Sequence, residues 1–162
     1  MSVTSLDKDL DDLTFTLVAD FAAPVERVWQ LWSDPRQLER WWGPPTYPAT
    51  VEEHDLTPGG DVTYFMTGPE GEKFRGWWRV ATVDGPRSLE FTDGFADEDG
   101  VPNAAMPTTA NRVTLTEREG GTRMEMRAVF DTREQMDQLM TMGMEEGLRE
   151  AAGQMDALLA AG

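Results

Sequence analysis

Alternation of apolar and polar residues predicts that most of the chain is β-structure. In residues 14–21 the side chains of Phe15, Leu17 and their alternate neighbours are apolar, which is the period of a half-buried strand. Six more segments of this kind are separated by turns rich in glycine and proline: 49–56, 61–67, a strand containing 74–80, one containing 89–91, one containing 113–115, and 124–130. The last segment alternates apolar residues with arginine and glutamate, so we expect a sheet that is covered on one face only.

Helical periodicity follows the first strand and returns at the C-terminus. Pro24 precedes apolar positions spaced i, i+3, i+4 and i+7 in residues 25–32, which predicts a short amphipathic helix. A second short helix is expected over 35–42, ended by a Gly-Pro-Pro sequence. From a cap at Asp131 or Thr132, a period of 3.6 residues continues for about 28 residues, which predicts a helix of roughly 40 Å.

In chain order, these elements predict an α+β fold. We expect a seven-stranded antiparallel sheet wrapped around one long C-terminal helix, with two short helices between strands one and two. Residues 1–13 contain four aspartates and lack the alternation, so they are expected to be a mobile acidic leader before a single domain of residues 14–162. Residues 93–108 are polar and rich in glycine and proline, and they are expected to form a surface loop.

Two glycines and several methionines occupy the apolar face of the long helix. Gly143 and Gly147 lie about one turn apart, and each costs about 1 kcal/mol relative to alanine in a helix interior. Methionine adapts to irregular shapes and specifies a solid core less well than leucine or isoleucine. Two interpretations remain open: the helix faces a cavity, or the glycines make room for a bulky side chain such as Trp78 or Tyr64.

The charge of the chain excludes several classes of partner. It has 30 acidic and 14 basic residues, a net charge of −16. Nucleic acids and anionic membrane surfaces require clustered lysine and arginine, so neither is an expected partner. No run of 18 apolar residues is present, so no membrane insertion is expected. Cysteine is absent, which excludes disulfides and Cys-ligated zinc, and nothing resembles a secretory signal, so we expect a cytoplasmic protein.

Few residues are candidates for catalysis. His54 is the only histidine, and strand alternation sends its neighbour Glu53 to the opposite face, so a structural role is expected. Nucleophile-elbow, dinucleotide-binding, P-loop and zinc-protease motifs are absent. The acidic run 97–100 lacks the flanking ligands of a calcium loop. We therefore assign no catalytic residue, metal or cofactor. If the protein were an enzyme, Glu53 and Tyr64 would be the only candidates for an inward acid or base.

Several blocks of the sequence resemble the family of activator-of-heat-shock-protein-90-ATPase homologues, within the START/SRPBCC superfamily. The blocks are Phe21–Trp29, Asp34-Pro35, Leu38–Pro44, Asp55–Gly60, Gly76 and Leu89–Thr92. The resemblance covers about residues 14–160 and implies the helix-grip fold of the birch-pollen allergen, in which a cavity separates the sheet from the helix. This chain has Thr57 where the family commonly has arginine, and Gly147-Leu148 where a Gly-Trp pair is frequent.

The resemblance implies binding of a small apolar or aromatic molecule in that cavity. The expected lining residues are Trp41, Trp42, Tyr64, Met66, Phe74, Trp78, Phe91, Met140, Gly143, Met144 and Gly147. The Tyr64 hydroxyl is the expected polar anchor, and one residue of the Trp41-Trp42 pair is expected at the cavity mouth. Two alternatives remain: an enzyme related to polyketide cyclases and dehydratases that uses the same cavity, and a chaperone ATPase activator. The resemblance also raises the possibility of a homodimer.

Overall fold

An antiparallel sheet is the framework of the computed structural model, which describes residues 3–161. Within these residues it has eight strands in the order β1-β2-β8-β7-β6-β5-β4-β3. They are β1 (Val3–Asp9), β2 (Thr14–Phe21), β3 (Ala49–His54), β4 (Asp61–Thr67), β5 (Lys73–Asp84), β6 (Ser88–Phe95), β7 (Thr109–Arg118) and β8 (Gly121–Val129). The α+β class and the single antiparallel sheet are thus confirmed.

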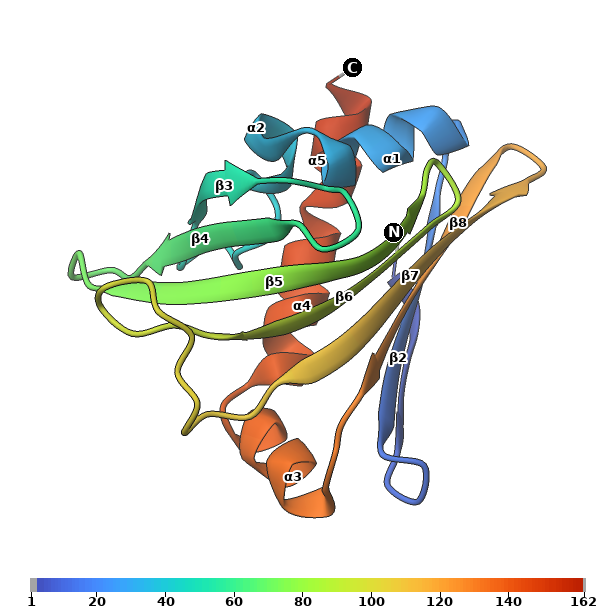
Figure 1. Cartoon of the computed structure of the whole chain (residues 1–162). Helices are drawn as coiled ribbons and strands as arrows, with labels where there is room; N and C mark the ends of the chain where they lie inside the picture. The colour runs from blue at the N-terminus through green and yellow to red at the C-terminus, as the bar shows by residue number, and fades with distance from the viewer. Residues whose placement is uncertain (1–2, 162) are drawn as a thin grey trace.

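The helices form two groups around this sheet. They are α1 (Val25–Ser33), α2 (Pro35–Leu38), α3 (Arg133–Thr141), α4 (Met144–Gly153) and α5 (Met155–Ala160). Figure 1 shows the strongly curved sheet with α3, α4 and α5 running along it, while α1 and α2 lie together at the end near α5. The expected pair of short helices between the first two predicted strands is present, although the second ends at Leu38, earlier than predicted.

The expected mobile leader is wrong, and its correction accounts for the eighth strand. Residues 3–9 form β1, which pairs antiparallel with β2 from Val3 opposite Ala19 to Asp9 opposite Thr14. The Asp9 carboxylate closes the turn between them by accepting hydrogen bonds from the backbone N–H groups of Asp11 and Asp12, each at 3.0 Å. β1 is an edge strand with mostly exposed residues, and charged side chains are typical of exposed edges. For this reason β1 lacks the apolar alternation that marks a central strand. Residues 1 and 2 of the expected leader lie outside the described residues.

The expected continuous C-terminal helix is also corrected, because it is interrupted twice. Gly143 has a φ of +94°, in the left-handed region, and it separates α3 from α4. Its backbone N–H donates to the carbonyl of Met140 at 3.0 Å, as is typical where glycine ends a helix. The second break, at Gln154, is milder because that residue keeps right-handed helical backbone angles.

The loop predicted over 93–108 is shorter at its N-terminal end. β6 continues to Phe95, so the connection to β7 begins at residue 96. Asp93 and Phe95 extend the inward alternation that starts with Leu89 and Phe91. The strand was underestimated because polar Asp93 and Gly94 interrupt its apolar pattern.

A large aromatic cluster fills the core next to α1 and α2. The Trp41 side chain is fully buried, and its indole N–H donates to the carbonyl of Leu31 at 2.8 Å. The Trp42 side chain is also buried, with 8% of the residue exposed. The expectation that one of this pair would cover a cavity mouth is therefore wrong. Both residues follow α2 in an irregular turn, whose backbone is not bound to helical spacing and lets both side chains enter the core.

Candidate ligand-binding site

The inner face of the sheet, defined as the face that carries its buried side chains, changes character along β6. Leu89 and Phe91 are buried, whereas Asp93 and Phe95, the next two inward residues, are half-buried. We call the solvent-accessible part of this face the open half. It comprises Met66, Asp93, Phe95 and Asn111 from the strands, with Met140 and Met144 from the helices.

Aromatic rings fill the rest of the inner face. The rings of Trp78 and Phe91 stack with their centroids 4.0 Å apart, and Trp42 meets Trp78 edge-on at 4.8 Å. Trp32 packs edge-on against Trp41 at 4.7 Å. Pairs in these geometries contribute about 0.5–1.5 kcal/mol each beyond the burial of their area. This half is therefore a solid wall, and a ligand would contact only the side of it that borders the open half.

The middle of the C-terminal helical segment packs loosely beside the open half. Met140 and Met144 are half-buried, and Gly147 is half-buried with no atom within 4 Å of the position that a Cβ would take. Close packing of a bulky side chain against Gly147 is thus contradicted. Gly143 is exposed, and its positive φ explains the glycine without any packing requirement.

Polar contacts fix the C-terminal end of this segment. The Gln154 side-chain amide donates to the carbonyls of Trp41 at 3.3 Å and Gly43 at 2.7 Å. The Arg27 guanidinium donates to the carbonyl of Leu158 at 3.0 Å, which ties α1 to α5. Near the start of α4, Lys8 of β1 forms an ion pair with Glu145 at 2.9 Å. The helices are therefore held on either side of the loosely packed stretch around Gly147.

Asp93 is a carboxyl group on the inner face. A small part of the residue reaches solvent, but protein surrounds the carboxyl group closely enough that burial raises its pKa to about 7. The side-chain amide of Asn111, on the neighbouring strand, opposes this shift of the pKa, although its hydrogen bond at 3.1 Å is donated to the carbonyl of Thr109. No lysine, arginine or histidine among residues 3–161 forms an ion pair with Asp93.

Tyr64 joins the aromatic wall to Asp93. Burial raises the pKa of the Tyr64 phenol, and the negative charge of Asp93 raises it further. The indole N–H groups of Trp42 and Trp78 lie near enough to the phenol to oppose these effects, yet neither completes a hydrogen bond. The phenol ring lies over Gly76, its partner on β5, where a Cβ would collide with the ring. The open half thus borders a phenol and two indole donors with unused hydrogen-bonding capacity.

The structure separates the predicted lining residues into groups. Met66 is half-buried and belongs to the open half, and buried Tyr64 lies beside it. Trp42, Trp78 and Phe91 form the adjacent wall. Trp41 belongs to the solid core, and Gly143 is exposed at the helix break. Phe74 is 53% exposed, and its ring contacts Tyr47, with centroids 5.8 Å apart, instead of the aromatic cluster.

The two residues singled out on β3 lie away from the open half. A register shift between Val51 and Glu53 leaves Glu53 exposed, where it accepts a hydrogen bond from Thr63 at 3.3 Å. Its proposed role as an inward acid is therefore wrong. His54 has the structural role that was expected: its Nε2 atom lies 3.0 Å from the carbonyl oxygen of Trp32 and ties β3 to α1.

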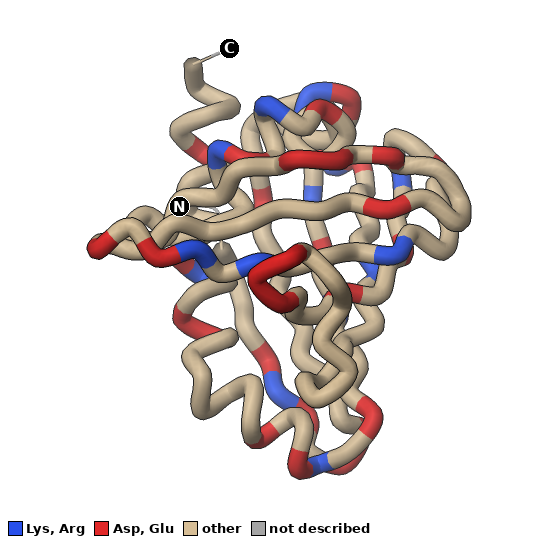
Figure 2. The backbone as a smooth tube through the Cα atoms, turned by 60° about the vertical axis from the view of Figure 1, so that its left-hand side comes forward, with Lys and Arg blue, Asp and Glu red and all other residues tan. Residues whose placement is uncertain are grey.

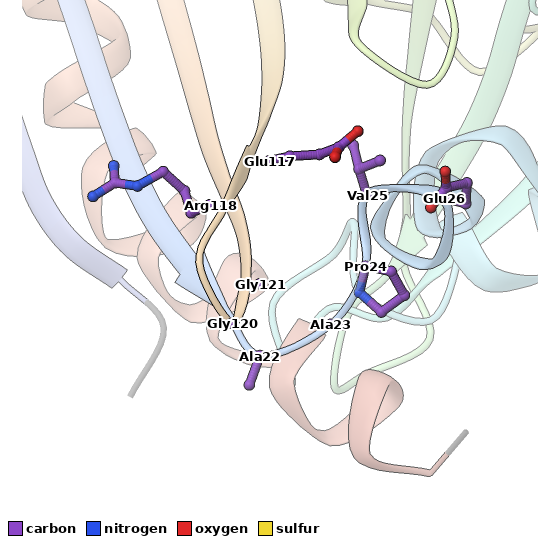
Figure 3. Close-up of a pocket in the computed structure, with 9 residues that line it drawn as sticks. All are labelled: Ala22, Ala23, Pro24, Val25, Glu26, Glu117, Arg118, Gly120 and Gly121. Carbon is purple, nitrogen blue, oxygen red and sulfur yellow. The ribbon is translucent and has the colours of Figure 1, made fainter.

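Two surface hollows occur elsewhere on the molecule, and none of the predicted lining residues contributes to either. One, of about 370 Å³, forms where residues 22–26 meet the β7–β8 turn. Figure 3 shows Glu117 directed toward Val25 and Arg118 directed away from it, so this hollow is not a basic site. The other, of about 430 Å³, includes Trp29 and Pro86. Within residues 3–161, no group of three acidic or histidine side chains could hold a metal ion, and no helix combines the length and apolar character needed to cross a bilayer.

Asp93 and Asn111 belong to the candidate site but were not predicted from the sequence. Both interrupt otherwise apolar inward positions, at Leu89-Phe91-Asp93-Phe95 on β6 and Asn111-Val113-Leu115 on β7. Strict alternation by two from the buried residues would have placed them on the inner face. A polar residue at such a position is a sign of function, because burying it without a partner costs stability.

Comparison with known proteins places this geometry in a family. The model for "Activator of Hsp90 ATPase homolog 1-like protein" matches residues 22–160. A search of curated proteins finds no match. The crystal structure of protein Ms6760 from Mycobacterium smegmatis is 54% identical, with a TM-score of 0.90 over 97% of this chain and 96% of that one. A solution structure from Arthrobacter aurescens is 53% identical, with a TM-score of 0.95 over 99% and 94% of the two chains. The chain therefore belongs to the family of Activator of Hsp90 ATPase homolog 1-like proteins.

Proposed function

We propose that the protein binds a small, largely apolar molecule between the open half of the inner face and the C-terminal helices. The observation that carries this proposal is a set of half-buried residues on the core side: Met66, Phe95 and the Asp93 carboxyl on the sheet, with Met140 and Met144 on the helices. The same sheet face buries Leu89 and Phe91 almost completely, so its cover is incomplete around Asp93. Ligand sites combine apolar walls with a few polar groups in this way.

Methionine and aromatic side chains give this space its chemical character. Thioethers adapt to ligands of irregular shape, and the Tyr64 phenol and the Asp93 carboxyl are the polar groups beside them. We expect a ligand with a flat apolar body and one polar head group.

A pair of glycine substitutions tests the location. Gly147→Leu places a side chain in the open space beside α4, while Gly153→Leu adds the same side chain at an exposed position of the same helix. Neither glycine has a positive φ or an atom within 4 Å of the Cβ position, so both variants should fold. Each should be stabilised by up to about 1 kcal/mol, because leucine favours a helix more than glycine does.

The measurement is the thermal shift of wild-type protein and both variants against a library of aromatic and lipid-like compounds, followed by titration of the compounds that stabilise. We expect compounds whose affinity falls at least tenfold in Gly147→Leu and is unchanged in Gly153→Leu. Binding that is equal in both variants, or a library with no binder, would contradict the proposed site.

A second candidate function is acid–base catalysis on the bound molecule. The observation in its favour is an inward carboxyl, Asp93, whose pKa of about 7 suits proton transfer at neutral pH, close to the phenol of Tyr64. Loss of a detectable turnover in Asp93→Asn with ligand binding retained would support catalysis. Retention of that turnover in Asp93→Asn would exclude Asp93 from the chemistry.

A further inference from the structure

We propose that the head group recognised in the open half is a protonated amine, held by the Asp93 carboxylate and the aromatic side chains beside it. This inference rests on the proposed binding function and adds the chemical class of the ligand. It starts from the charges and rings that surround Asp93.

The first observation is that the inner face provides no positive charge to balance Asp93. The neighbouring inward residues are Phe91 and Phe95 on β6, Trp78 directly opposite on β5, and Thr109 directly opposite on β7 with Asn111 next to it. None of them carries a positive charge. Tyr64 on β4 is the titratable group that responds to the charge of Asp93. A buried carboxylate is normally paired with a cation, because an unpaired charge loses its solvation. Within the described residues Asp93 has no such partner, and a ligand with a positive head group would supply one.

The helices that border the open half provide no cation either. Their half-buried side chains toward the core are Met140, Met144 and Leu148, none of which titrates. Glu145 turns toward β1, where it pairs with Lys8, and Arg149 lies exposed beside Glu145 at 3.8 Å. Neither α3 nor α4 therefore supplies a positive charge to balance Asp93.

The second observation is the concentration of aromatic rings next to this carboxyl. Trp78 and Phe91 stack at 4.0 Å, and the rings of Trp42 and Tyr64 meet edge-on at 6.1 Å. The electron-rich faces of tryptophan, tyrosine and phenylalanine attract cations, most strongly where water is excluded. Of these rings, Trp42 and Tyr64 keep the most exposed area, 8% and 9%, so they are the ones that an ammonium group beside the carboxylate would meet. The carboxylate itself would repel an anion.

The net charge of the whole molecule also favours a cationic ligand over an anionic one. Figure 2 shows acidic residues on strands, loops and helices around the molecule, and the net charge is −16. A negative protein raises the local concentration of cations and lowers that of anions. This negative field attracts every cation near the protein, so selectivity for an amine in the open half has to be traced to Asp93 itself.

The test uses three probes with one ring system and different head groups: naphthylmethylamine, naphthylmethanol and naphthoate. Calorimetric titration at pH 8 in 0.15 M NaCl should give an affinity for the amine at least tenfold above that for the alcohol, with naphthoate weakest. The pKa of about 7 leaves roughly 3% of Asp93 ionised at pH 5.5, so the preference for the amine should fall at least tenfold there.

Two variants assign the effect to the carboxyl. Asp93→Asn keeps the shape and removes the charge, so amine affinity should fall to that of the alcohol while alcohol affinity is unchanged. Glu90→Gln removes one charge from the same strand on the opposite face, and it should keep the amine preference.

The outcomes separate this inference from the function on which it rests. If none of the three probes binds, the proposed function itself is contradicted. If the alcohol binds as tightly as the amine, or if Asp93→Asn retains the preference, the binding function stands and the amine assignment is wrong.

Discussion

Replacement of Asp93 by asparagine should stabilise the protein, and the gain should depend on pH. The pKa of Asp93 is about 7 in the folded protein and 3.8 in a solvated chain, a difference of about three pH units. At 1.36 kcal/mol for each unit, the charged form destabilises the fold by up to about 4 kcal/mol. This is an upper bound, because part of the residue reaches solvent.

The sign of the effect follows from which state binds the proton more tightly. Below pH 3.8 both states are protonated and Asp93 costs nothing. Between pH 4 and 7 the unfolded chain releases the proton while the folded protein retains it, so stability falls by up to about 1.4 kcal/mol per pH unit. Above pH 7 the full cost is present. Asparagine carries no charge at any of these pH values.

Urea unfolding at pH 4 and pH 8 measures this difference. We expect Asp93→Asn to be more stable than wild type by about 2–4 kcal/mol at pH 8 and by only about 0.6 kcal/mol at pH 4. Glu90→Gln serves as the control for loss of one negative charge and should show neither change. A variant that is no more stable than wild type at pH 8, or a gain that is the same at both pH values, would refute the account of Asp93.

Three further substitutions test other parts of the structure by chemical denaturation. Gly143→Ala should lose about 1–2 kcal/mol because alanine disfavours the φ of +94° at the α3–α4 break; unchanged stability would mean that the break is not required. Gln154→Ala should lose about 1–3 kcal/mol because the carbonyls of Trp41 and Gly43 lose their donor; a neutral result would show that the anchor is dispensable. Gly76→Ala should destabilise and shift the near-ultraviolet circular dichroism, because the new methyl collides with the Tyr64 ring, and a native spectrum would argue against that packing.

The architecture could be predicted from the sequence wherever one periodicity dominated. The alternation in β2 and β8 is uninterrupted, and both strands are present with the predicted inward residues. Edge strand β1 was missed because charged residues replace the apolar side chains that a central strand would bury. The break at Gly143 was missed because a helix tolerates a glycine, and periodicity alone does not reveal a positive φ.

The site was predicted less completely because it depends on contacts between distant strands. Apolar residues such as Met66 and Met140 could be assigned to the right face from spacing alone. Asp93 lay in a segment interpreted as a loop, since its polarity was taken as a sign of exposure. The pairing of β6 with β5 and β7 places Asp93 opposite Trp78 and Thr109, and the sequence of β6 alone does not give these neighbours.

Binding of a small molecule in the open half can be located residue by residue through backbone amide chemical shifts, with naphthylmethylamine as the probe. We expect the shifted amides to cluster at residues 64–66, 93–95, 111 and 140–148, and Gly147→Leu to abolish the shifts. Shifts confined to the hollow formed by residues 22–26 and the β7–β8 turn, or the absence of any shift at saturating probe, would contradict binding in the open half.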